Sequence, residues 1–123
     1  MNGTKYLADT NVFLYIIAGN SGVQEYLNKE FYLSEISEIE LLGVKDIKAI
    51  QLKYRSKIIE TCTIVALSEN IKRLTIRLKQ NYTLKIPDAI IAATAIFLNF
   101  PLLTADKEFK KIKELDLILI QPE

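Results

Sequence analysis

The sequence predicts one α/β domain over residues 1–123, a three-layer α/β/α sandwich with a central, mostly parallel sheet. Three observations support this prediction. Short apolar or β-branched runs alternate with helical segments along the whole chain, which is typical of a parallel sheet covered on both faces. A chain of 123 residues has the size of one domain and buries roughly two-thirds of its unfolded surface. No repeat, linker or low-complexity tract divides it.

The first strand is expected over residues 5–8, which are short and apolar. The turn and cap residues Asp9-Thr10-Asn11 end it. Residues 12–18 are apolar over the length of a helix, and the run Gly19-Asn20-Ser21-Gly22 ends that helix.

The next segment predicts a short helix over residues 23–28 and a second strand over residues 31–33. Either Ser34 or Ser37 is expected to begin the following helix. Ser37 and Glu40 have the spacing of a capping box, and a glycine three residues later ends the helix.

The middle of the chain predicts a long amphipathic helix over residues 46–60, because apolar positions recur between charged ones. Residues 61–67 (TCTIVAL) are β-branched and predict a third strand. Ser68 is expected to cap another helix that ends at about residue 80, and residues 81–87 form a loop.

Asp88 is expected to begin the next helix, directly after Pro87. Residues 89–98 are apolar on nearly all sides, which predicts a buried helix, and ten residues cannot span a bilayer. Three short elements complete the chain, a strand, a helix and a strand over residues 102–104, 105–112 and 115–120.

The composition excludes several kinds of chemistry. The single cysteine, Cys62, rules out a disulfide framework and a cysteine-rich metal site. The chain has no histidine, which rules out His-dependent triads, HExxH metalloproteases and ribonucleases with a His pair. The N-terminus lacks the features of a signal peptide, so we expect a cytoplasmic protein without a membrane segment.

Charge is distributed unevenly along the chain. Residues 45–87 hold ten Lys and Arg against three acids, whereas residues 1–44 hold two bases against six acids. This pattern fits two solvated helix faces. It also fits a basic rim that binds a polyanion beside an acidic centre.

Four carboxylates are candidates for a functional site. Asp9 follows the first predicted strand, and Asp106, with Thr104 before it, follows the fourth. Asp88 lies at the mouth of the buried helix, and Glu40 lies inside an apolar segment. Ligands of open α/β sheets bind outside the carboxyl ends of the strands, so these acids could converge on one edge.

Converging carboxylates favour a bound divalent cation, because like charges raise one another's pKa. Oxygen ligands suit Mg²⁺ or Mn²⁺, whereas zinc usually takes His or Cys ligands. Such an ion bridges phosphate oxygens and supports phosphodiester hydrolysis without histidine.

Each acid also has a structural interpretation. Asp9 and Asp88 are suited to cap helices, and Glu40 to complete a capping box. Asp106 is suited to be a surface acid at a helix N-terminus. No single residue is specific, so the metal-site hypothesis depends on their combination.

Three segments carry a family resemblance. LADTNVFLYI matches a start in which DTN stands between a strand and a helix, and SEISEIELLG matches a segment with an acid before Leu-Leu-Gly. IPDAIIAATAIFLNFPLLTADKEFKKI matches a PDA-x-IAATA helix followed by a strand and T-x-D. In order and spacing, the chain resembles the PIN domain family, and most closely its small VapC-type toxin ribonucleases.

The resemblance implies a set of metal-binding and catalytic acids, namely Asp9, Glu40, Asp88 and Asp106. It implies that Asn11 and Thr104 are polar supports of the site. Glu40 is chosen over Glu35 and Glu38 because only Glu40 directly precedes Leu-Leu-Gly. The role of Glu108 stays open.

The resemblance also implies an Mg²⁺- or Mn²⁺-dependent endoribonuclease that leaves 5′-phosphate and 3′-hydroxyl ends. It implies a small antitoxin protein as partner and a homodimer. In the basic segment, Arg73, Arg77 and Lys85 are the expected RNA-binding residues. Two alternatives are a PIN-like RNA-processing nuclease without a toxin role and a catalytically silent α/β module that binds protein or RNA.

Overall fold

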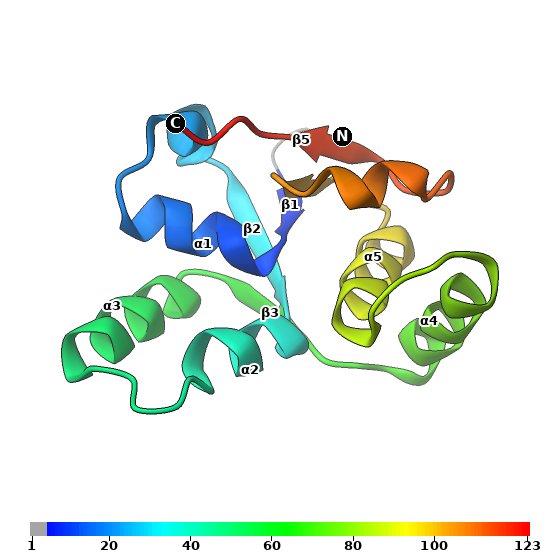
Figure 1. Ribbon diagram of the computed structural model, residues 1–123, viewed down its shortest axis with the longest axis horizontal. Coiled ribbons are helices and arrows are strands. Elements are labelled where there is room, and N and C mark those ends of the chain that lie inside the picture. The colour runs from blue at the N-terminus through cyan, green and yellow to red at the C-terminus, as the bar shows by residue number, and fades with distance from the viewer. Residues whose placement is uncertain (1–4) are drawn as a thin grey trace.

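The computed structural model describes residues 5–123 as a five-stranded sheet with helices on both faces (Figure 1). The strand order is β3-β2-β1-β4-β5, and all four pairings are parallel. The strands are β1 (Lys5–Ala8), β2 (Glu30–Ser34), β3 (Thr63–Val65), β4 (Leu102–Thr104) and β5 (Leu117–Leu119). The predicted three-layer α/β/α fold is confirmed.

Five α-helices and two 3₁₀ helices connect the strands in the described part of the chain. The α-helices are α1 (Thr10–Ile17), α2 (Glu35–Leu42), α3 (Ala49–Glu60), α4 (Glu69–Asn81) and α5 (Ile86–Leu98). The 3₁₀ helices are η1 (Ser21–Tyr26) and η2 (Lys107–Lys111).

The sheet separates two hydrophobic cores, because successive side chains of a strand point to opposite faces. Leu7 of β1 and Leu102 of β4 pack with α4, α5 and η2. The next residues, Ala8 and Leu103, pack with α1, η1, α2 and α3. The helices of the two cores lie on opposite sides of the sheet in Figure 1.

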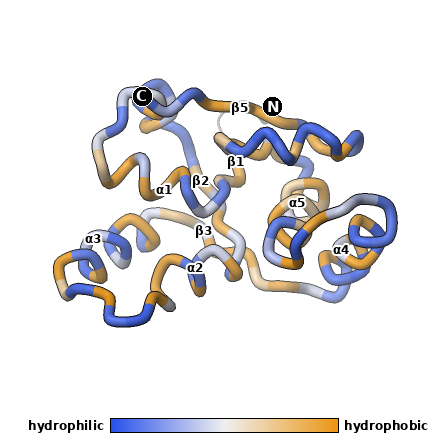
Figure 2. The backbone as a smooth tube through the Cα atoms, viewed as in Figure 1, coloured by the Kyte–Doolittle hydropathy of each residue, from blue (hydrophilic) through white to orange (hydrophobic). Residues whose placement is uncertain are grey.

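The buried helix expected over residues 89–98 is α5; every residue from Ala89 to Ala95 is buried, whereas Phe97 near the end of the helix is 45% exposed. Figure 2 shows the contrast with α4, which alternates between hydrophilic and hydrophobic residues around its turns. No helix within residues 5–123 is both long and apolar enough to cross a membrane.

The capping box predicted for Ser37 and Glu40 is wrong. Ser34 is the N-cap of α2 and accepts a hydrogen bond from the Ile36 N–H at 3.3 Å. Because β2 continues to Ser34 and the helix follows at once, Ser37 is inside α2, where it is completely buried.

Several element boundaries also differ from the prediction. α3 begins at Ala49, since Asp46 has a φ of 57° and is not helical. α5 begins at Ile86, which places Asp88 in the first turn of the helix. The helices predicted over 23–28 and 105–112 are the short 3₁₀ helices η1 and η2, and the outer strands β3 and β5 are shorter than predicted.

Candidate active site

Asp9 lies at the carboxyl end of the central strand β1 and is the N-cap of α1. Its side chain is only 8% exposed. One carboxylate oxygen accepts the Thr10 N–H at 2.8 Å, and the other accepts the Thr104 hydroxyl at 2.8 Å. The capping interpretation of Asp9 is therefore correct, and the carboxylate also points toward the neighbouring strand β4.

Thr104 connects two of the candidate acids. Its hydroxyl donates to Asp9 and accepts the backbone N–H of Asp106 at 3.0 Å. Thr104 ends β4 and is completely buried, so the hydroxyl is held at the edge of the sheet. Asp106 is the exposed N-cap of η2 and accepts the Glu108 N–H at 2.9 Å.

Glu40 is held at the same edge by the first turn of α1. The Thr10 hydroxyl donates to Glu40 Oε1 at 2.7 Å. The Thr10 hydroxyl oxygen also lies 2.8 Å from the Ser37 hydroxyl oxygen. Glu35 accepts the Leu67 N–H instead. The structure thus places Glu40 beside α1, whereas Glu35 contacts the segment after β3.

A hollow of about 370 Å³ brings these groups together. All four candidate acids line it, and Asn11 lies in its wall as well. The residues come from the end of β1, α1, α2, α5 and the turn after β4, which lie far apart in the sequence. The convergence expected from the strand ends is therefore present, although the roles assigned to these residues stay predictions.

The electrostatics of the hollow are unfavourable to two of the carboxylates. Burial raises the pKa of Asp9, the negative charges of Asp88 and Asp106 raise it further, and its two hydrogen bonds lower it. Burial also raises the pKa of Asp88, as do Asp106 and Glu40, while Lys85 and Lys111 lower it. No ion pair to Asp9 or Asp88 occurs among residues 5–123.

These groups fit an oxygen-ligated divalent cation. Within the described residues, no three acids are arranged to hold a metal ion directly. Mg²⁺ does not require this arrangement, because it usually keeps several waters and binds through one or two carboxylates and substrate phosphates. The buried Asp9 and the half-buried Asp88 supply the anionic oxygens for such an ion, and a cation there would reverse the rise in their pKa.

A second hollow, of about 470 Å³, adjoins the first and shares Asp88 and Asp106 with it. Lys85, one of the expected RNA-binding residues, lines this second hollow. Glu108 also lines it and forms an ion pair with Lys111 at 3.1 Å.

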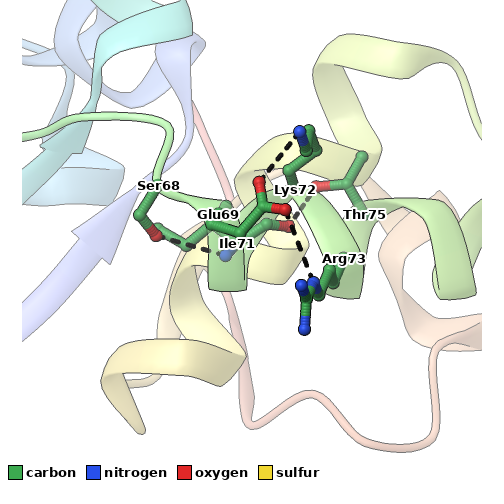
Figure 3. A network of polar contacts seen from close by, with 6 residues as sticks. All are labelled: Ser68, Glu69, Ile71, Lys72, Arg73 and Thr75. Atoms are coloured by element: carbon green, nitrogen blue, oxygen red, sulfur yellow. Dashed lines mark hydrogen bonds and ion pairs between the residues drawn. The ribbon is translucent and has the colours of Figure 1, made fainter.

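The other two expected RNA-binding residues, Arg73 and Arg77, line neither of these two hollows. Both are exposed on α4. Figure 3 shows that Arg73 and Lys72 reach back to Glu69, at 3.5 and 2.8 Å. Arg73 and Arg77 therefore lie on the exposed surface of α4, outside the hollow that the four acids line.

Two contacts beside the candidate acids are not evident from the sequence pattern. Ser37, predicted as a cap, instead lies 2.8 Å from the Thr10 hydroxyl oxygen. Arg55 of α3 lines the first hollow and donates to the Leu41 carbonyl at 2.8 Å, next to Glu40. This contact between α3 and α2 could not be predicted from the sequence, which shows only that a basic residue is present at position 55.

Comparisons with known proteins agree with this geometry. Residues 6–115 match the sequence profile of the PIN domain. A chain of a toxin–antitoxin complex from Klebsiella pneumoniae is 30% identical to this chain, with a TM-score of 0.78 over 92% of this chain and 95% of that one. A comparison with curated protein sequences gives no match.

Two further solved structures share the fold. VapBC2 from Rickettsia felis, solved with a DNA fragment from its promoter, is 24% identical with a TM-score of 0.80, over 95% of this chain and 99% of that one. VapBC-1 from nontypeable Haemophilus influenzae is also 24% identical, with a TM-score of 0.78 over 94% and 97%.

The metal-free protein is expected to lose stability as pH rises from about 4 toward neutrality. Asp9 and Asp88 have a raised pKa in the folded state, so the folded protein holds protons that the unfolded chain releases. The stabilising effect of these protons is complete below the unfolded pKa and is lost as pH rises through the folded pKa.

The variant Asp88→Asn should therefore melt a few degrees above the wild type at neutral pH in EDTA, and the difference should shrink in acid. Thermal denaturation followed by circular dichroism across this pH range measures both effects. Glu69→Gln is the control, because ion pairs lower the pKa of Glu69 and its removal should not stabilise the protein. Equal melting temperatures for wild type and Asp88→Asn at neutral pH would contradict the raised pKa of Asp88.

Proposed function

Because the chain belongs to the PIN domain family, we propose that it is a metal-dependent endoribonuclease and the toxin of a VapC-type toxin–antitoxin pair. The single observation that supports nuclease chemistry best is the convergence of four carboxylates on one hollow. One of them, Asp9, is almost completely buried, and its carboxylate accepts hydrogen bonds from a backbone N–H and a hydroxyl. Such a site attracts a cation and, with it, a phosphodiester.

In this proposal Asp9, Glu40, Asp88 and Asp106 together would hold Mg²⁺ or Mn²⁺, one or two of them directly and the others through waters that the ion keeps. When bound, the ion would polarise a phosphoryl oxygen of RNA and stabilise the charge that develops during in-line displacement. Thr104 orients Asp9 by donating to one of its oxygens, and Thr10 does the same for Glu40. Asn11 offers an exposed amide at the rim for positioning the substrate.

The proposed partner is a small antitoxin protein, and the proposed assembly is a homodimer. The similarity to a chain of the Klebsiella pneumoniae toxin–antitoxin complex over nearly its whole length supports the first part. An RNA-processing nuclease without a toxin role would use the same carboxylates. Co-expression with the protein encoded by the neighbouring gene separates the two, since only a toxin should be inhibited by it.

Removing divalent metal should abolish RNA cleavage, and Mg²⁺ or Mn²⁺ should restore it. The reason is that the hollow is lined by four carboxylates and the chain has no histidine. A phosphodiester therefore needs a cation to bind beside these acids. A purified-protein assay on single-stranded RNA with EDTA, followed by metal addition, measures the effect. Full activity in excess EDTA would rule out the metal mechanism.

Asp88→Asn should lower the rate of cleavage by at least about a hundredfold. Changes in residues that only hydrogen-bond to metal ligands already lower metal affinity or activity by roughly 10- to 100-fold. Glu69→Gln should leave cleavage nearly unchanged, because Glu69 forms only exposed ion pairs at the start of α4. Both changes remove one negative charge and preserve side-chain shape. Equal losses in the two variants, with folding intact, would place the site elsewhere.

The double change Arg73→Gln with Arg77→Gln should weaken RNA binding without changing the turnover rate at saturating RNA. The two side chains are i,i+4 neighbours on the exposed surface of α4 and lie outside the acid-lined hollow. Loss of two phosphate contacts should flatten the logarithmic salt dependence of binding by about 1.4 for single-stranded RNA. Binding titrations at several salt concentrations, together with measurements of kcat, test this prediction. A fall in kcat with unchanged binding would instead assign these residues to the chemical step.

A further inference from the structure

The hollow beside the four acids is lined by lysines from three separate elements. Lys79 lies in the last turn of α4, Lys85 is the N-cap of α5, and Lys111 ends η2. With a volume of about 470 Å³, the hollow falls in the range of small-molecule sites, roughly 300–1,000 Å³, and can hold a nucleotide. Its wall toward the first hollow is formed by Asp88 and Asp106.

The contacts of the lysines leave donors available. Lys79 Nζ donates to the Leu84 carbonyl at 2.5 Å, which uses one of its three N–H groups. Lys111 forms an exposed ion pair with Glu108, and such pairs contribute little energy and exchange readily. Lys85 is exposed, and its side chain makes no hydrogen bond or ion pair among residues 5–123 that a bound phosphate would have to break.

The two hollows therefore differ in their balance of charge. The first contains four carboxylates and one guanidinium, from Arg55. The second has three ammonium groups against three carboxylates, and two of these, Asp88 and Asp106, also line the first hollow. A phosphodiester enters the first hollow only with a cation, whereas the lysines attract a phosphodiester directly.

We infer that the lysine-lined hollow binds the phosphodiester that adjoins the cleaved one, so that the RNA strand crosses the acids from one hollow to the other. The inference rests on the proposed function and adds a binding site to it. Lys85 and Lys111 hold the adjoining phosphate, and Lys79 mainly supports the loop before α5 through the Leu84 carbonyl. The arginines of α4 do not line this hollow.

The test uses single-stranded RNA oligonucleotides in which the position cut by the wild type has been mapped. In one oligonucleotide all linkages are natural, and in two others a neutral methylphosphonate replaces the linkage on either side of the cut. The protein variants are Lys85→Gln with Lys111→Gln, and the control Lys53→Gln with Lys57→Gln on α3. The control removes the same charge from exposed positions that line neither hollow. Lys79 is left unchanged because its loss would also disturb the Leu84 contact.

For the wild type and the control, one of the two neutral linkages should weaken binding in EDTA about tenfold, since it removes one charge-assisted contact. The Lys85 and Lys111 variant should bind natural RNA more weakly by a similar factor and should show no further loss with that neutral linkage.

If the neutral linkages weaken the lysine variant as much as the wild type, the adjoining phosphate does not bind in this hollow and the inference is overturned, while cleavage by the wild type still supports the nuclease. If the wild type neither binds nor cleaves RNA of any sequence tested, the proposed function fails and the inference fails with it. An acidic partner protein that binds the hollow in place of RNA would give the first of these results.

Discussion

The burial of Asp9 at the end of the central strand is the constraint on which the rest of the site depends. A carboxylate that is 8% exposed loses most of its hydration and must be compensated by donors. Two donors are supplied, the Thr10 N–H and the Thr104 hydroxyl. The acids nearby act in the opposite direction and raise its pKa. Because the fold concentrates negative charge here without an ion pair to Asp9 or Asp88 among residues 5–123, the site suits a cation.

The topology of the sheet explains why residues so distant in sequence meet at Asp9. β1 lies between β2 and β4, and all three strands point the same way. Their carboxyl ends deliver Asp9, Ser34 and Thr104 to one edge. The apolar body of α5 is drawn into the core, which leaves the polar first turn with Asp88 at the same edge. The hydrophobic packing of α5 thus fixes the position of the Asp88 carboxylate at the edge of the sheet.

The basic segment of the chain does not form one surface. Its two helices lie on opposite sides of the sheet, since Ile59 of α3 belongs to one core and Ile71 of α4 to the other. Arg55 reaches the first hollow from α3, whereas Lys79 and Lys85 reach the second from α4 and α5. The positive charge of the segment is therefore divided between the two hollows, which share Asp88 and Asp106.

The sequence by itself determined the fold class, the order of the elements and the four carboxylates that meet at one edge. These follow from local causes, namely apolar periodicity, cap residues and the rule that the ends of parallel strands share an edge. Tertiary structure decided the partners of the side chains. Ser37 has the spacing of a cap but packs against Thr10, because β2 extends to Ser34 and begins the helix there. Thr104 joins Asp9 to Asp106, and Arg55 and Lys111 reach different hollows, through contacts between elements. Such contacts depend on the packing of helices against the sheet, and the local pattern of residues contains no information about them.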